Sequence, residues 1–140
     1  MNIGNILATK GSRVITIHPE QSLKEAIALL TQHQIGALVV VDKAGKPVGI
    51  LTERDIVHAA DRSGEAMLKH AVKDVMTKNV VIATPHDELQ SVLKTMSDRR
   101  FRHMPVMDEG QLAGIISIGD VVKAQLDEYR GAIDTLQSQL

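Results

Sequence analysis

The chain has 140 residues, of which 44% are hydrophobic and 24% charged, and its formal net charge is −1. These values are typical of one globular domain, and they provide no field that would attract nucleic acid or an anionic membrane. Aromatic residues make up 1% of the chain and cysteine is absent, which argues against base stacking and excludes disulfides, a thiolate nucleophile and a zinc–thiolate site. The first residues lack a signal-peptide pattern, and no stretch reaches the roughly 20 apolar residues that span a bilayer. We therefore expect a soluble, cytoplasmic protein.

The first half of the chain predicts a β-α-β-β-α order that begins with a short strand or extended entry at residues 13–17. Ser22 and Glu25 have the spacing of a capping box, and apolar residues recur at helical spacing as far as Leu30. Gly36 is expected to end that helix. The apolar, β-branched run that follows suits a strand buried on both faces. The predicted order is then strand 37–41, turn 42–46, strand 48–51 and a helix from Thr52.

The second half of the chain repeats the first. Residues 14–19 return at 80–85, and residues 49–55 return at 114–120 after one residue is dropped in a turn. A long internal period indicates one folding unit used twice, each copy covering the hydrophobic face of the other. Residues 61–78 connect the copies and should be largely helical. The second copy is predicted as strand 80–83, helix 87–98, strand 104–107, turn 108–110, strand 112–116 and a helix from residue 118.

Several stretches carry a family resemblance. They are Pro19 with Leu23, Ile35 to Val40 (IGALVV), Gly49 to Asp55 (GILTERD), Phe101 to Val106 (FRHMPV) and Gly114 to Asp120 (GIISIGD). Occurring in order, twice and at consistent spacing, they resemble a stand-alone pair of CBS domains, a Bateman module, over about residues 8–125. The resemblance implies an α/β fold of two pseudo-symmetric repeats that form one CBS pair, followed by a C-terminal helix. The expected organisation is CBS repeat 1 at 8–62, a helical linker at 63–78, CBS repeat 2 at 79–125 and the helix at 126–140.

The resemblance also implies a function. CBS pairs sense adenine nucleotides, so we expect a regulatory module, not an enzyme, that binds an adenine nucleotide in the cleft between its repeats. AMP is the favoured ligand, and ADP, ATP, NAD and S-adenosylmethionine are the alternatives. The module is expected to form a homodimer and to act on a regulated protein that the sequence does not identify. A ligand-free dimerisation scaffold is the second interpretation, and an enzyme is the third, without a visible nucleophile–base pair to support it.

Two polar motifs, Thr52-x-x-Asp55 and Ser117-x-x-Asp120, stand where a predicted strand ends and a helix begins. The unpaired N–H groups and positive dipole end of a helix suit a phosphate, and an aspartate accepts hydrogen bonds from both hydroxyls of a ribose. The resemblance assigns the Ser/Thr hydroxyl to phosphate and the aspartate to ribose. The alternative is that each motif only caps its helix, because Ser/Thr-x-x-Asp resembles a capping box.

Residues 99–103 (RRFRH) form the densest positive cluster of the chain, and Arg102 and His103 are its last two members. We predict that Arg102 or His103 holds a phosphate, and that main-chain groups near His103 and Met104 read the adenine edge. The alternative is a solvated helix end, where the cations stabilise the negative end of the helix dipole. Copy one carries residues 34–37 here, without a cation, so its site should bind anions more weakly, with Arg54 as a partial substitute.

Other candidate positions are weaker. In CBS pairs the position of Thr77 commonly contacts the sugar or the base, although a threonine in a turn is as often a local cap. Val80 is expected as an apolar wall beside the purine, Gly119 lies inside the second motif, and Ser12 is the weak counterpart of Thr77 in copy one. The six histidines form no metal-binding pair and are interpreted as scattered surface residues, so neither a metal nor a required cofactor is expected.

The tail carries a heptad seam, in which apolar residues alternate steps of four and three: Val122, Leu126, Tyr129, Ile133, Leu136 and Leu140. The pattern predicts a helix whose seam either joins two chains or lies on the surface of its own chain. Gly131 lies inside it and costs about 1 kcal/mol in a helix interior.

Overall fold

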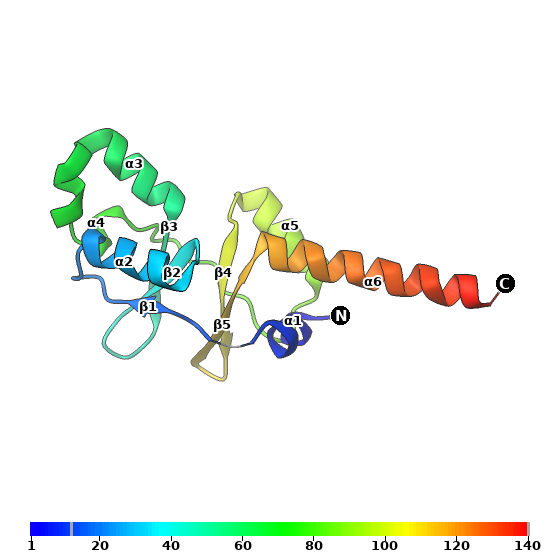
Figure 1. Cartoon of the computed structure of the whole chain (residues 1–140). Helices are drawn as coiled ribbons and strands as arrows, with labels where there is room; N and C mark the ends of the chain where they lie inside the picture. Colours follow the sequence, from blue (N-terminus) through cyan, green and yellow to red (C-terminus); the bar gives the residue numbers. More distant parts are fainter. Residues whose placement is uncertain (12, 140) are drawn as a thin grey trace. The chain divides into compact units, whose positions relative to one another are not determined.

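The structure, a computed structural model, describes residues 1–11 and 13–139. Its elements are α1 (Ile3–Lys10), β1 (Thr16–Ile17), α2 (Leu23–His33), β2 (Ala37–Val41), β3 (Pro47–Thr52), α3 (Glu53–Ser63), the 3-10 helix η1 (Gly64–Lys69), α4 (Val72–Val75), α5 (Leu89–Arg99), β4 (His103–Asp108), β5 (Gln111–Ser117) and α6 (Ile118–Ser138) (Figure 1). Unit 1 comprises residues 1–11, 82–109 and 113–139, and unit 2 comprises residues 13–81 and 110–112. The repeated mixture of helices and strands, with a C-terminal helix, confirms the predicted α/β fold class.

Unit 2 is built on a three-stranded sheet in the order β1-β2-β3. β1 runs parallel to β2, with Thr16 opposite Val39, and β2 runs antiparallel to β3, with Leu38 opposite Leu51. All of β2 is buried, as its unbroken apolar run predicts. The apolar stripe of α2 joins this strand in one core of Ile17, Leu23, Ala26, Leu30, Leu38, Val40, Leu51, Ala59 and Val72.

Unit 1 repeats this plan around β4 and β5, which form a two-stranded sheet. Ala83 pairs with Val106 in a parallel bridge and so occupies the place that Ile17 takes beside β2. The helices α1, α5 and α6 bury Ile3, Ile6, Leu89, Val92, Met96 and Val121, and the strands bury Met104, Val106 and Ile116. The same folding unit is thus used twice, as the internal period predicts.

Helix α1 was not predicted from the sequence. Asn2 and Asn5 form a reciprocal capping box at its start, and the amides of Ile3 and Gly4 donate to the carbonyls of Asp87 and Pro85, both at 2.9 Å. The helix is therefore fixed to unit 1 by its first turn as well as by its apolar face.

Two local predictions were wrong. Gly36 does not end α2: the helix ends at His33, and Gln34 is the C-cap in the left-handed region, with φ of 53°. Strand 80–83 is reduced to the single bridge at Ala83. The chain passes from unit 2 to unit 1 between residues 81 and 82, so this apolar run does not stay on one sheet. The connection at 61–78 is helical as far as Val75, apart from a break at residues 70–71.

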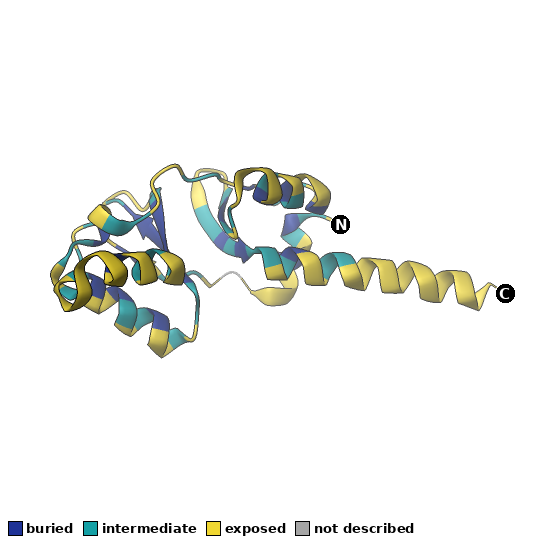
Figure 2. Cartoon of the chain, turned by 90° about the horizontal axis from the view of Figure 1, so that it is seen from above, coloured by how far each residue is buried: buried dark blue, intermediate teal, exposed yellow. Residues whose placement is uncertain are grey.

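Helix α6 continues without interruption from the second repeat into the tail. Within the described residues, the heptad seam from Val122 to Leu136 is 40% to 65% exposed at each position, and Figure 2 shows this part of the helix exposed along its length. The seam is therefore not covered by its own chain, and Leu140 lies outside the described residues. Among residues 1–11 and 13–139, no helix combines the length and apolar character needed to cross a membrane.

Candidate functional site

In unit 2, Thr52 and Asp55 meet at the N-terminus of α3. Thr52 Oγ1 accepts a hydrogen bond from the Asp55 amide at 3.3 Å, and Asp55 Oδ2 accepts one from the Thr52 amide at 3.0 Å. Thr77 Oγ1 donates to Asp55 Oδ1 at 3.3 Å, and its main chain exchanges hydrogen bonds with Ile50 in β3. We call Thr52, Asp55 and Thr77 the Asp55 site. A residue of the same motif, Thr52, and a residue 22 positions away, Thr77, thus meet at the Asp55 carboxylate.

In unit 1, Ser117 and Asp120 make the same arrangement at the N-terminus of α6. Ser117 Oγ accepts from the Asp120 amide at 3.1 Å, and Asp120 Oδ2 accepts from the Ser117 amide at 2.8 Å. The third member is Lys10, whose Nζ donates to Asp120 Oδ2 at 2.6 Å and to the Ile115 carbonyl at 2.8 Å. We call Lys10, Ser117 and Asp120 the Asp120 site. Ser12, the sequence candidate near this position, lies outside the described residues.

The main chain of Arg102 contacts the start of α6, beside the Asp120 site. Its carbonyl accepts the amide of Ile118, the first residue of α6, at 2.8 Å, and its side chain is exposed. In unit 2 the carbonyl of Gly36 accepts the amide of Glu53 at 3.1 Å in the same way. The main chain that precedes the central strand therefore supports the helix start in both units, and only unit 1 places a cation there.

Two other cations of the cluster, Arg99 and Arg100, lie at the C-terminal end of α5. The Arg99 guanidinium lies over the Phe101 ring, 5.7 Å from its centroid, and Arg100 is the left-handed C-cap. These two residues follow the alternative interpretation of a helix end. His103 and Met104 begin β4, where His103 is half-buried and Met104 buried.

Arg54 and Gly119 occupy the second residue of α3 and α6, and both are exposed. A Cβ at Gly119 would meet Ser117 Oγ at 3.6 Å, an ordinary contact, so the packing of unit 1 does not demand glycine there. Val80 is half-buried, and its amide donates to the Lys78 carbonyl at 2.7 Å in a tight turn. Among the described residues, no side-chain hydrogen bond or ion pair joins these three residues to the Asp55 site or the Asp120 site.

Both motifs form complete capping boxes. The alternative interpretation of these motifs as helix caps is therefore realised in both units, and the spacing alone does not require a ligand. Both aspartates are nevertheless only half-buried, and each meets a further donor from a distant part of the sequence. A cap needs neither feature.

The carboxyl of Asp120 is electrostatically perturbed. Partial burial by itself raises its pKa, but the hydrogen bonds from Lys10 and Ser117 and the positive charge of Lys10 outweigh that effect and hold the pKa below the ordinary value of aspartate. A group with a lowered pKa in the folded state contributes stability above its unfolded-state pKa, and loses that contribution as the pH falls through the folded-state pKa.

We therefore expect the stability difference between the unaltered protein and Asp120→Asn to be constant above about pH 5 and to shrink below about pH 4. Asparagine cannot titrate, so the difference isolates the Asp120 carboxylate. Urea unfolding followed between pH 3 and pH 7 measures it. Asp134→Asn, at an exposed position of α6, is the control and should leave the acid limb unchanged. A difference that stays constant down to pH 3 would contradict the assignment.

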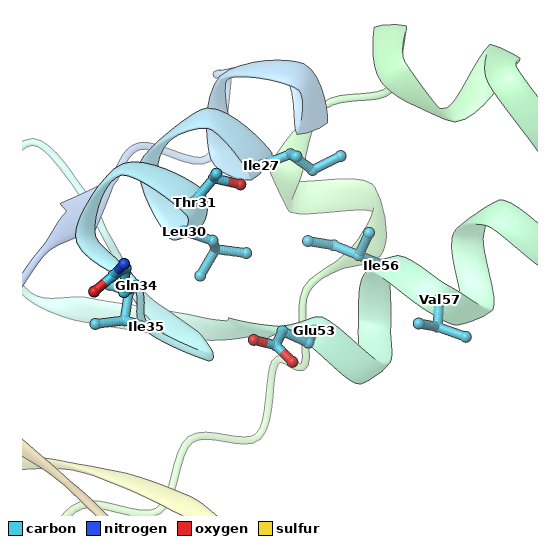
Figure 3. Close-up of a pocket in the computed structure, with 8 residues that line it drawn as sticks. All are labelled: Ile27, Leu30, Thr31, Gln34, Ile35, Glu53, Ile56 and Val57. Atoms are coloured by element: carbon cyan, nitrogen blue, oxygen red, sulfur yellow. The ribbon is translucent and has the colours of Figure 1, made fainter.

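A groove lies between α2 and α3 in unit 2, with a volume of about 440 Å³. Figure 3 shows Leu30 and Ile56 directed into the space between the helices, with Glu53 at one end. The full lining is Ile27, Leu30, Thr31, Gln34, Ile35, Glu53, Ile56 and Val57. A mostly aliphatic lining does not supply the convergent polar groups that a nucleotide requires. Among the described residues, no group of three or more His, Asp or Glu side chains is arranged to hold a metal ion.

Two α/β units with matching capped helix starts define a tandem-repeat protein with a pair of related sites. The family model of the CBS domain matches residues 3–62 and 72–127. The chain belongs to the CBS domain family, and the resemblance seen in its sequence is confirmed.

Known relatives cover nearly the whole chain. The crystal structure of the CBS-domain containing protein ATU1752 from Agrobacterium tumefaciens is 46% identical, with a TM-score of 0.85, over 89% of this chain and 99% of that chain. The CBS domain-containing protein YhcV of Bacillus subtilis is 32% identical over 89% of this chain and 87% of its own length. The CBS domain pair of protein MJ0100, solved with 5'-methylthioadenosine and S-adenosyl-L-methionine, is 29% identical, with a TM-score of 0.80, over 91% of this chain and 98% of that chain.

Lys10 is not among the site residues predicted from the sequence. The internal period of 66 positions places residue 11 opposite Thr77, so a lysine next to that position was the available signal. A serine at residue 12 resembles the Thr77 hydroxyl more closely than a lysine does, so the sequence pattern favours Ser12.

Proposed function

We propose that this protein is a regulatory module, without catalytic activity of its own, that binds adenosine-containing ligands at the Asp55 and Asp120 sites. The observation that carries the proposal is the occurrence, in both units, of a half-buried aspartate at a helix N-terminus with a hydroxyl cap and a donor from a distant segment. The ligands in the related MJ0100 structure, 5'-methylthioadenosine and S-adenosylmethionine, share the adenosine moiety. AMP is the ligand that we favour for this chain.

Each group has a chemical role in this proposal. Asp55 and Asp120 accept hydrogen bonds from the ribose hydroxyls, and the caps Thr52 and Ser117, with the amides of the helix start, hold a phosphate. Thr77 adds a contact to the sugar or the base.

In unit 1, Arg102 or His103 supports the phosphate, and main-chain groups near His103 and Met104 meet the adenine. Val80 provides an apolar wall, and Arg54 partly replaces Arg102 in the Asp55 site. The Asp55 site is accordingly the weaker one for phosphate-rich ligands.

We predict that Asp120→Ala lowers the affinity for AMP by about tenfold or more, as expected for the loss of a charge-assisted hydrogen bond. Isothermal titration calorimetry measures the affinity. Asp120→Asn retains an oxygen that can accept the Ser117 amide but lacks the charge, so it separates the ribose contact from the cap. The asparagine variant should lose affinity while losing less stability than the alanine variant in urea unfolding.

The matched control is Asp134→Ala, on an exposed turn of the same helix, which should bind AMP as the unaltered protein does. Unchanged AMP affinity in both Asp120 variants would move the ligand to another place. Mass spectrometry of any ligand released from the purified protein identifies which adenosine compound is bound.

We also propose that the protein is a homodimer joined along the heptad seam of α6. The seam residues are exposed over a helix of 21 residues, and burying each of the larger ones is worth about 1.5–3 kcal/mol. Ile133 and Leu136 stand at the a and d positions of one heptad, a combination that favours two strands. Gly131 falls on the outer f position, where a Cβ would meet nothing within 4 Å, so it does not interrupt the seam.

The charges beside the seam favour a parallel pair. The e positions hold Lys123, Arg130 and Gln137, and the g positions hold Gln125, Ala132 and Gln139. A parallel pair sets e against g, so each cation faces a neutral residue, whereas an antiparallel pair sets e against e and brings cations together. A scaffold that dimerises without a ligand is the second candidate function, and the exposed seam is the observation in its favour. AMP-dependent thermal stabilisation separates the two, because only a ligand that binds the native state raises its stability.

A further inference from the structure

The two sites differ in the group that reaches the aspartate from outside the motif. In unit 2, Thr77 donates its amide to the Ile50 carbonyl at 2.9 Å and its hydroxyl to Asp55. In unit 1, a single group, the Lys10 ammonium, donates both to the Ile115 carbonyl, at 2.8 Å, and to Asp120. Ile50 and Ile115 are equivalent in the repeat. One positive charge therefore takes the place of two neutral donors.

Lys10 is held in place by the packing of α1. Ile3 and Ile6 of this helix are buried in unit 1, and Leu7 packs so closely on β5 that a Cβ at Gly114 would lie 2.7 Å from its side chain. Gly11 ends the helix directly after Lys10, and its amide donates to the Leu7 carbonyl at 2.8 Å. The lysine is thus delivered from a fixed helix end, while its flexible side chain can still move.

The surroundings reinforce the difference in charge. Beside the start of α6 stands Arg102, whereas the equivalent residue of unit 2 is Gly36. A Cβ at Gly36 would lie 3.4 Å from Oε1 of Glu53, so a carboxylate lies next to this position in unit 2. At the start of α6, unit 1 therefore places the Lys10 ammonium on Asp120, and the main chain of a second cationic residue, Arg102, accepts the Ile118 amide. At the start of α3, the first residue is the carboxylate Glu53, and the donor that reaches Asp55 from outside the motif is the uncharged Thr77.

We infer that Lys10 determines the charge preference of the Asp120 site, an inference that rests on the proposed function. In the empty site the ammonium neutralises Asp120. When an adenosine nucleotide binds, the ribose hydroxyls take the place of Lys10 on the carboxylate, and the ammonium turns to the phosphate. An uncharged adenosine derivative also displaces Lys10 but offers it no anion in return. The Asp120 site therefore selects anionic adenosine ligands, and the Asp55 site, with its neutral donor, selects uncharged or cationic ones.

Calorimetric titration with AMP and with uncharged 5'-methylthioadenosine tests this inference. Lys10→Met should lower the affinity for AMP by about tenfold or more, since a charge-assisted contact to phosphate is lost. The affinity for 5'-methylthioadenosine should stay the same or rise. Lys10→Arg keeps the charge and should keep the preference for AMP. Lys43→Met, in the exposed turn between β2 and β3, removes the same net charge elsewhere and should change neither affinity.

The outcomes separate two failures. An equal loss of affinity for both ligands in Lys10→Met, or no loss for either, would overturn the role of Lys10 while leaving adenosine binding intact. A failure of the unaltered protein to bind either ligand would overturn the proposed function, and the inference with it. A preference for AMP that is lost in Lys10→Met and kept in Lys10→Arg supports the inference.

Discussion

Replacing Ile133 by aspartate should convert the proposed dimer into a monomer. Ile133 stands at the centre of the heptad seam and is 52% exposed on its own chain, so the substitution costs the isolated chain little. In a paired seam the same change places two carboxylates in an apolar interface, and an unpaired charge that loses its water costs several kcal/mol. Light scattering coupled to size-exclusion chromatography, over a series of protein concentrations, measures the mass of the particle.

Thr135→Asp is the matched control, because it adds the same charge two residues away on an outward-facing c position of the same helix. It should leave the dimer intact. A chain that ends at Glu128 lacks most of the seam and should dissociate as Ile133→Asp does. If the shortened chain remains a dimer of equal strength, the seam does not hold the assembly together and the contact lies in the repeats.

The sequence predicted those parts of the fold whose cause is local or repeated. The capping residues Thr52 and Ser117 lie where a strand ends and a polar pattern begins, and both helices start there. The continuous apolar run of β2 predicted a fully buried strand, and all of it is buried. Such features are visible in one sequence because a cap and a buried strand each depend on neighbouring residues.

The errors lie where neighbouring residues compete or where the partner is distant. Gln34 adopts the left-handed conformation that glycine favours, although Gly36 is only two residues away. Arg100 takes the same conformation at the equivalent position of unit 1, so the helix length of the repeat decides which residue ends the helix. The apolar character of residues 80–82 predicted a strand, but their pairing depends on where the chain crosses between the units.

For the candidate site, too, the sequence predicted the local part more completely than the distant contacts. Each Ser/Thr-x-x-Asp pair is a local motif, and the structure brings its members together. Thr77 reaches Asp55 from 22 residues away, and Lys10 reaches Asp120 from 110 residues away. The resemblance to CBS pairs was enough to single out Thr77. It could not identify Lys10, because the two copies use different chemistry at this point.

Gly49→Ala is expected to lower the free energy of unfolding by about 1–3 kcal/mol, the usual cost of overpacking a buried position. A Cβ at Gly49 would lie 2.5 Å from Met76 Sδ and 3.0 Å from the Thr77 carbonyl oxygen. Met76 packs against the core of unit 2, and the Thr77 carbonyl accepts the Ile50 amide at 3.0 Å, so neither can withdraw freely. The strain should also move the Thr77 hydroxyl away from Asp55 and weaken that site. Urea unfolding measures the stability.

Gly114→Ala is the internal control for this prediction, because Gly114 is the equivalent of Gly49 in unit 1. There the new Cβ would meet the tip of a leucine, Leu7 Cδ2 at 2.7 Å, and a side-chain tip can move where a bonded carbonyl cannot. Replacing glycine by alanine also lowers the entropy of the unfolded chain, which favours folding by about 0.4–1 kcal/mol. We therefore expect Gly114→Ala to change stability by less than about 1 kcal/mol. An equal loss in both variants would show that contact with the Thr77 main chain is not what restricts Gly49.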